Sequence, residues 1–281
     1  MAEITAKDIS ALRKQTGAGM LDSRRALQET GGDIEAAKDW LRTQGLAGAA
    51  GRAGRAANDG AVDVVVENGK GAIVELTCET DFVAKGEDLR GMVAALAKLV
   101  VERGAEDLES QPYDGGTVGD AIKQLGAKVG ENVALGRVAR IETNDGIVDG
   151  YKHIQNERGT IGVVVEIGGV DASDDRAREV AHDIALHVAS AAPRYVTRDD
   201  VPADVVDKER SVLEELTRNE GKPEQAIPKI VEGRLNAFFK DNVLLEQPFV
   251  RDPRTIVGKL LGELGKEATV RRFVRIKVGE E

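Results

Sequence analysis

One short segment, Leu76–Lys85, carries the most chemically distinctive side chains of this sequence. A thiol and two carboxylates, Cys78, Glu79 and Asp81, stand here beside the phenyl ring of Phe82. The apolar residues before the segment predict a strand, and the apolar periodicity after it predicts a helix. An acid next to a ring on such a corner suits a wedge, because the ring supplies contact area and the acid supplies charge. It suits catalysis poorly, because apart from Cys78 and Glu79 no acid, base or nucleophile lies nearby in the sequence.

Each of these side chains also has an ordinary structural interpretation. Cys78 would need a base to act as a nucleophile, and all three histidines lie far away in the sequence, so we favour a small apolar residue at a strand end. Glu79 and Asp81 without further oxygen ligands would bind a hard cation only weakly. From the residues alone, Asp81 is best interpreted as an acid at a helix N-terminus and Phe82 as a core residue.

Other motifs give little support for nucleotide or metal chemistry. The run Gly17-Ala18-Gly19 lacks the third glycine of a dinucleotide loop and follows a predicted helix, and no P-loop motif occurs. His182 and His187 are five residues apart, about 140° around a helix, whereas a shared metal requires a spacing of three or four. We therefore expect no cofactor and no metal. Met20 and Leu21 could form an apolar docking patch or could pack inside their own helical unit, and composition leaves both open.

The composition bounds the class of protein. A chain of 281 residues with 41% hydrophobic side chains can form two or three compact units, and with only 3% aromatic residues its core must be aliphatic. The net charge of −10 argues against general nucleic-acid binding, which needs a basic face. The single cysteine excludes an intramolecular disulfide. Because the sequence has neither a signal peptide nor a long uninterrupted apolar run, we expect a soluble cytoplasmic protein without membrane contact.

The first part of the chain, residues 1–45, predicts a three-helix module. Thr5 and Asp8 form a capping box for the first helix, and glycine pairs or runs separate the three helices. Such a small unit buries a modest core and is expected to be marginally stable alone. Residues 46–58 carry almost no large apolar side chain and predict a linker, in which the alanines would permit some helix.

Residues 59–142 predict the first of two α+β core units. Alternating valines followed by Asn68-Gly69 indicate a strand and a type I′ hairpin turn. A helix at 118–129 and a strand at 132–141 complete this unit. We therefore predict an α+β fold class with small antiparallel sheets.

Residues 143–281 predict a second, related core unit. Residues 145–149 echo 59–63, and residues 162–166 echo 71–75, which indicates an internal duplication of a strand-strand-helix element.

A helical hairpin at 203–239 interrupts the second unit. Its helices, at 203–219 and 224–239, are highly charged and can bury only one narrow seam, so we expect a protruding antiparallel coiled coil that could also support a homodimer. The residues predicted to face one another are Val205, Val212, Leu213 and Leu216 on the first helix and Ile227, Ile230, Val231 and Leu235 on the second.

Several motifs, in order along nearly the whole chain, resemble the translation elongation factor Ts family. The opening Ile4-Thr5-Ala6, Thr16-Gly17-Ala18-Gly19-Met20 and the run Thr80-Asp81-Phe82-Val83-Ala84-Lys85 are characteristic of that family. Further matches are Gly130-Glu131-Asn132, Tyr151-Lys152-His153, Leu186-His187-Val188-Ala189, Ile230-Val231-Glu232-Gly233-Arg234 and Gln247-Pro248-Phe249-Val250. The resemblance implies a UBA-like N-terminal module followed by the two core units.

The resemblance also implies an activity. Members of the family are guanine-nucleotide exchange factors for elongation factor Tu, which they bind in its GDP-bound and nucleotide-free forms. Asp81 and Phe82 would form the wedge that disturbs the Mg²⁺ and phosphate site of the partner, and Thr80 and Val83 would hold the wedge in shape. Further partner contacts would come from Arg13, Met20 and Leu21 of the N-terminal module and from Val129, Gly130 and His153 of the core. The family often has a second methionine where this sequence has Leu21.

Two other functions compete with this interpretation. The first is a protein-interaction scaffold without exchange activity, which would dock through the three-helix module and the helical hairpin. The second is a hydrolase that uses Cys78 as its nucleophile. Release of GDP from elongation factor Tu tests the first alternative, and replacement of Cys78 by alanine tests the second.

Overall fold

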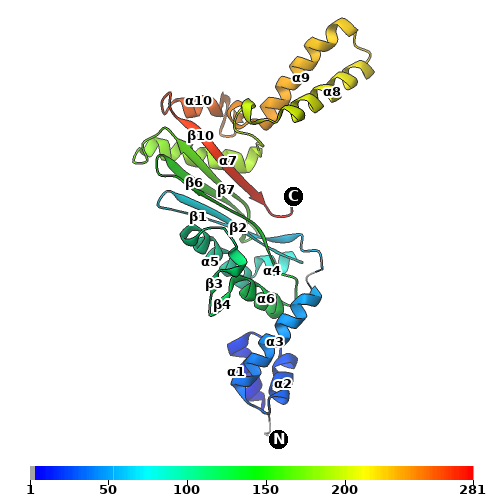
Figure 1. Ribbon diagram of the computed structural model, residues 1–281, viewed down its shortest axis with the longest axis vertical. Coiled ribbons are helices and arrows are strands. Elements are labelled where there is room, and N and C mark those ends of the chain that lie inside the picture. The colour runs from blue at the N-terminus through cyan, green and yellow to red at the C-terminus, as the bar shows by residue number, and fades with distance from the viewer. Residues whose placement is uncertain (1–3, 53, 281) are drawn as a thin grey trace.

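The computed structural model describes residues 4–52 and 54–280, and the side chains of these except those of residues 45–51. Residues 1–3 and 53, part of the predicted module and linker, lie outside the described residues. The molecule is elongated, with helices α1–α3 at one end, two three-stranded sheets in the middle and a helical hairpin at the other end (Figure 1). This architecture confirms the predicted α+β class with small antiparallel sheets and an N-terminal three-helix module.

Helices α1 (Ala6–Thr16), α2 (Met20–Glu29) and α3 (Ile34–Arg52) form the N-terminal module. The predicted capping box is present, because the Thr5 backbone N–H donates to Asp8 at 3.0 Å and the Asp8 N–H donates to the Thr5 hydroxyl. The module has a small core of four buried residues, Leu12, Ala26, Leu27 and Ala37. Helix α3 continues to Arg52, so much of the segment predicted as a linker is helical.

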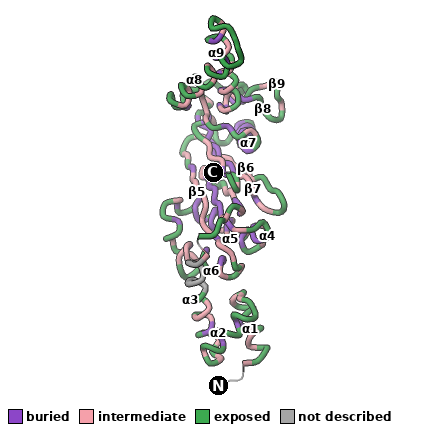
Figure 2. Tube along the Cα trace, turned by 90° about the vertical axis from the view of Figure 1, so that its right-hand side faces the viewer, coloured by how far each residue is buried: buried purple, intermediate pink, exposed green. Residues whose placement is uncertain are grey.

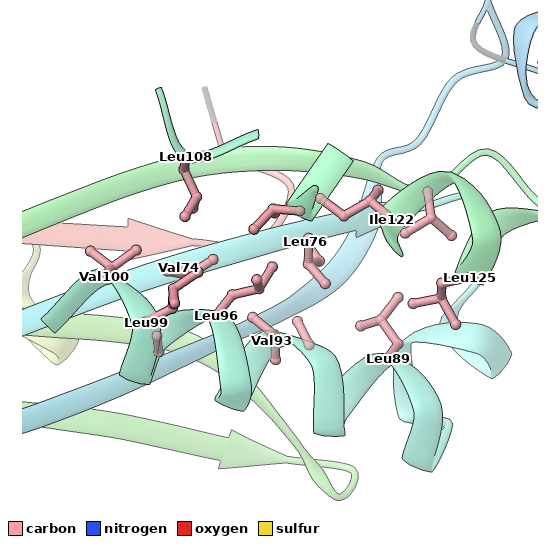
Figure 3. Close-up of a cluster of buried hydrophobic side chains, with 14 of the residues drawn as sticks. Val74, Leu76, Leu89, Val93, Leu96, Leu99, Val100, Leu108, Ile122 and Leu125 are labelled. Atoms are coloured by element: carbon pink, nitrogen blue, oxygen red, sulfur yellow. The ribbon is translucent and has the colours of Figure 1, made fainter. Parts of the chain in front are cut away.

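The first sheet has the strand order β1-β2-β5 and is antiparallel throughout. Its strands are β1 (Asp59–Glu67), β2 (Lys70–Cys78) and β5 (Ala134–Glu142). Asn68 and Gly69 both have positive φ, at 51° and 73°, which confirms the type I′ turn. Helices α5 (Glu87–Arg103) and α6 (Val118–Val129) pack their aliphatic side chains on this sheet (Figure 3). Between α5 and α6 lie the short strands β3 (Pro112–Tyr113) and β4 (Gly116–Thr117).

The second sheet has the order β10-β7-β6 and is also antiparallel. It consists of β6 (Ile147–Gln155), β7 (Arg158–Gly168) and β10 (Thr269–Lys277), and helix α7 (Asp175–Ala191) covers one face. A small hairpin of β8 (Pro248–Phe249) and β9 (Asp252–Ile256) and the short helix α10 (Val257–Gly262) complete its core. Within the described part of the chain, none of the helices has both the length and the apolar composition that crossing a bilayer requires.

The two sheets pack against each other through a shared aliphatic layer. Its buried residues come from both sheets and are Val62, Ile73, Ile141, Val148, Val164 and Ile276. Gly71 of the first sheet and Gly162 of the second permit this close approach, because a Cβ at either position would lie within 3 Å of valine or isoleucine side chains of the other sheet. The two units are therefore joined by a continuous core, and their division near residue 142 remains a prediction.

Helices α8 (Ala203–Asn219) and α9 (Ile227–Asn242) form the protruding hairpin, most of which is exposed (Figure 2). The prediction that Val212 and Leu216 lie in its seam is wrong, because they are 52% and 48% exposed. The seam uses the adjacent stripe of α8 instead, where Thr217 is fully buried and accepts a hydrogen bond from Arg234. Leu213 and Thr217 are one helical turn apart, so a seam through them turns Val212 and Leu216 toward solvent.

Candidate functional site

The predicted wedge lies where β2 ends and the short helix α4 (Asp81–Lys85) begins. Thr80 is the N-cap of α4, with φ −128° and ψ 153°, and its hydroxyl accepts a hydrogen bond from the Val83 N–H at 3.4 Å. Val83 and Ala84 are buried in the core below the first sheet. Because one side of this single-turn helix is anchored in that core, the side chains of Asp81 and Phe82 face solvent.

Phe82 is 84% exposed, the largest exposed fraction among the large apolar side chains described. In a chain with 3% aromatic residues, this placement contradicts the interpretation of Phe82 as a core residue. Asp81 is also exposed, and Lys85 donates a hydrogen bond to its carboxylate at 2.5 Å. That hydrogen bond and the charge of Lys85 lower the pKa of Asp81, so the corner presents an ionised carboxylate beside a bare ring.

A carboxylate from a distant segment fixes the backbone of this corner. Glu131, just after helix α6, accepts hydrogen bonds from the backbone N–H groups of Glu79 at 3.0 Å and Thr80 at 3.1 Å, and from the Thr80 hydroxyl at 2.5 Å. In return, the Glu79 carboxylate accepts from the Asn132 N–H at 2.6 Å. Sequence reasoning assigned no role to Glu131 or Asn132, although the resemblance to the family included both.

The thiol of Cys78 lies behind the corner and is fully buried. It donates a hydrogen bond to the Thr80 carbonyl at 3.2 Å. Burial, together with the negative charges of Glu131 and Asp59, raises the pKa of Cys78 to about 12. The thiol is therefore protonated at neutral pH and has neither the accessibility nor the charge of a nucleophile. Among the described residues, no three His, Cys, Asp or Glu side chains form a group suited to a metal ion.

A turn of the second sheet also lies beside the corner. Arg158, at the start of β7, forms an ion pair with Asp59 and donates to the Gly60 carbonyl at 2.6 Å. Arg90 of α5 donates to the Glu157 carbonyl at 2.9 Å. Because Asp59 pairs with Cys78 at the end of β2, the second unit contacts the first directly behind the corner.

His153 belongs to a small cluster of rings, in which His153 and His182 are exposed and Tyr151 is half-buried. It stacks on Tyr151 with ring centroids 6.3 Å apart, and the two side chains lie within hydrogen-bonding distance at 3.3 Å. Tyr151 and His182 form a T-shaped pair with ring centroids 6.2 Å apart, and His182 hydrogen-bonds to Asp149 at 3.1 Å. His187, in contrast, is fully buried and bonds to Gln247 at 2.9 Å, so the two histidines of α7 have separate structural roles.

The predicted residues of the N-terminal module also face solvent. Met20 and Leu21 are 60% and 79% exposed, so they are not part of the core of their own module, and Arg13 is exposed at the end of α1. The turn before Met20 contacts the end of α6 through Gly17 and Lys128. A groove of about 670 Å³ runs between the two parts, and Val129 and Gly130 line it. The structure thus brings Val129 and Gly130 between the N-terminal module and the wedge.

Comparisons with known proteins identify the family of this chain. The sequence profile of the family described as Elongation factor TS matches residues 79–280. Elongation factor Ts of Micrococcus luteus is 46% identical over 284 residues, which cover 99% of this chain and all of the relative. Elongation factor Ts of Streptomyces avermitilis is 46% identical, over 99% of this chain and all of the relative. Elongation factor Ts of Rhodospirillum rubrum is 44% identical, over all of this chain and 94% of the relative.

The fold and these matches place the chain among the translation elongation factors. It belongs to the elongation factor Ts family.

Proposed function

We propose that this protein is the guanine-nucleotide exchange factor for elongation factor Tu. Membership of the elongation factor Ts family is the observation that carries the proposal. The protein would bind Tu in its GDP-bound form, promote release of GDP and remain bound to the nucleotide-free form until GTP enters. The whole process takes place in the cytoplasm and involves no covalent chemistry, no cofactor and no direct contact with nucleic acid.

The wedge would act through Asp81 and Phe82, with Thr80 and Val83 holding the corner. The exposed ring of Phe82 would enter the partner close to its Mg²⁺ and phosphate site, and the ionised Asp81 would disfavour a bound anion there. Exchange needs no large energy, because a tenfold faster release corresponds to about 1.4 kcal/mol at the barrier. By linkage, bound nucleotide weakens the affinity of Tu for this protein by the same factor by which this protein weakens nucleotide binding.

Two further surfaces would increase the affinity for Tu without disturbing its nucleotide site. The first is formed by the guanidinium of Arg13 and the exposed apolar side chains of Met20 and Leu21, which would dock on the GTPase domain of Tu. The second, around His153, would contact a more distant domain of Tu, and Val129 and Gly130 would lie near the wedge.

The proposal is tested by the release of a fluorescent GDP analogue from elongation factor Tu. The expected result is a release rate that rises with the concentration of this protein and then saturates. A protein that binds Tu without changing the release rate would instead be a scaffold.

A further inference from the structure

We propose that Glu131 is a positioning residue for nucleotide exchange, which holds the corner so that Phe82 is presented in one orientation. This inference rests on the proposed function and goes beyond it, because Glu131 itself need not touch the partner. Its carboxylate acts on the wedge through the backbone of Glu79 and through Thr80.

The position of Glu131 in the fold explains why a carboxylate is needed there. The pairing of β2 ends at Thr77 with β5 and at Cys78 with β1, so the N–H groups of Glu79 and Thr80 lie beyond the last strand pairs on both sides. Glu131 accepts hydrogen bonds from both of these N–H groups, in place of a neighbouring strand. Hydrogen bonds to an ionised acceptor are about twice as strong as those between neutral groups.

Thr80 transmits this restraint to the helix that carries the ring. Its hydroxyl donates to Glu131 at 2.5 Å and accepts from the Val83 N–H at 3.4 Å. A chain of hydrogen bonds therefore runs from Glu131 through Thr80 to the first turn of α4, which contains Phe82. Loss of the carboxylate would release the cap of a helix only five residues long, which has little stability of its own.

The backbone that carries Glu131 is itself held in place by neighbouring elements. Helix α6 begins with a capping box of Thr117 and Asp120, and its C-cap is Gly130, whose φ is 80°. Lys128 in its last turn forms an ion pair with Asp88 of α5 at 2.7 Å. Just beyond Glu131, the Asn132 N–H donates to Glu79, 53 residues away in sequence, which closes a second link between the same two segments. The Glu131 carboxylate therefore extends from a helix end whose position is restrained.

A purely structural role would give different consequences from a positioning role. A residue that only stabilises the fold would lower the free energy of unfolding, and its loss would slow exchange whether or not the ring is present. A residue that positions Phe82 would lose its effect on exchange once the ring has been removed. A double-mutant cycle between Glu131 and Phe82 therefore separates the two.

The experiment measures the maximal rate and the half-saturating concentration for stimulated release of fluorescent GDP from Tu. We expect Glu131→Ala to lower the maximal rate about tenfold, which corresponds to about 1.4 kcal/mol, with a smaller change in half-saturating concentration. Glu131→Gln, which retains one acceptor oxygen, should give an intermediate loss. Adding Glu131→Ala to Phe82→Ala should change the rate by less than about twofold, which is the size of error expected for such cycles. As a matched control, Glu102→Ala removes an exposed carboxylate of α5 and should leave both parameters unchanged.

The free protein gives a second measurement that does not depend on Tu. Hydrogen exchange of the Glu79 and Thr80 amides should be faster in Glu131→Ala and Glu131→Gln, while the circular dichroism spectrum stays that of a folded protein. Equal slowing by Glu131→Ala with and without the ring, or a normal rate in both Glu131 variants, would overturn the inference. If the wild-type protein did not accelerate release at all, the proposed function would fail instead, and the two failures are thus distinguished.

Discussion

Replacing Phe82 by alanine should separate the action of the wedge from the stability of the fold. In the free protein 84% of this residue is exposed, so its removal should change the free energy of unfolding by less than about 0.5 kcal/mol. Full burial of a phenylalanine side chain contributes about 1.5–3 kcal/mol. If the partner covers the exposed 84%, about 1.3–2.5 kcal/mol is available to lower the barrier to GDP release.

This range predicts a decrease of about 10- to 70-fold in the maximal rate of stimulated GDP release. The assay is stopped-flow fluorescence with labelled GDP on elongation factor Tu, at saturating concentrations of wild-type and variant protein. The affinity for nucleotide-free Tu, measured separately by titration, should fall less than the rate, because the proposed action of the ring is on the bound nucleotide.

Leu21→Ala is the matched comparison for Phe82→Ala. Leu21 is 79% exposed in the N-terminal module, and its loss should raise the half-saturating concentration without lowering the maximal rate. Equal losses of rate and of affinity in Phe82→Ala would show that the ring is only an anchor, and a normal maximal rate would refute the wedge.

Four further predictions concern the core and the thiol. Arg137→Ala should lower the free energy of unfolding by about 2–3 kcal/mol in urea titrations, because it leaves the buried carboxylate of Glu75 without its bidentate partner; a loss near zero would argue against this pair. Gly71→Ala should cost about 1–3 kcal/mol in the same titration, because its methyl group would overlap valines of the second sheet. Cys78→Ala should leave GDP release unchanged, and the native thiol should resist alkylation at pH 7, since its pKa is raised to about 12; rapid alkylation would contradict the burial. Burial alone would raise the pKa of Glu166, but hydrogen bonds from two arginines of β10 outweigh this effect and lower the pKa below its ordinary value of 4.5. The ionised Glu166 therefore stabilises the folded protein fully above pH 4.5, and this stabilisation is lost as the pH falls through the pKa of the folded state. Thermal melts between pH 6 and pH 3 should show that Glu166→Gln loses less stability than wild type on acidification.

Local sequence signals predicted the secondary structure well. Asn68-Gly69 specified a turn with two positive φ values, and the Thr5–Asp8 box specified a helix start, because each depends on residues only a few positions apart. Short runs of alternating or continuous apolar residues predicted strands of small antiparallel sheets for the same reason. The exposed position of Phe82, in contrast, came from the family resemblance, since composition alone favoured a core residue.

Long-range relations were not predictable from one sequence. Glu131 lies 51 residues from Thr80, and nothing in its local pattern distinguishes it from other glutamates on the surface. The packing of the sheets through Gly71 and Gly162 was also not predicted. A glycine within a strand indicates only a weakened strand until the side chains of the opposing sheet are known. The hairpin seam was assigned to Val212 and Leu216 by hydropathy, whereas the neighbouring stripe with the polar Thr217 is the one that is buried.

The shared layer between the sheets has a consequence for synthesis of the chain on the ribosome. Ile276 of β10, five residues from the last residue, belongs to the same layer as Val62 of β1. At about 5–20 residues per second, the roughly 200 residues between β2 and the end of β10 take about 10–40 s to emerge. During that time β6 and β7 can already cover part of the first sheet through Val148 and Val164, but the layer stays incomplete until Ile276 of the final strand emerges, so the nascent wedge-bearing half has an interval of exposure to chaperones and to aggregation.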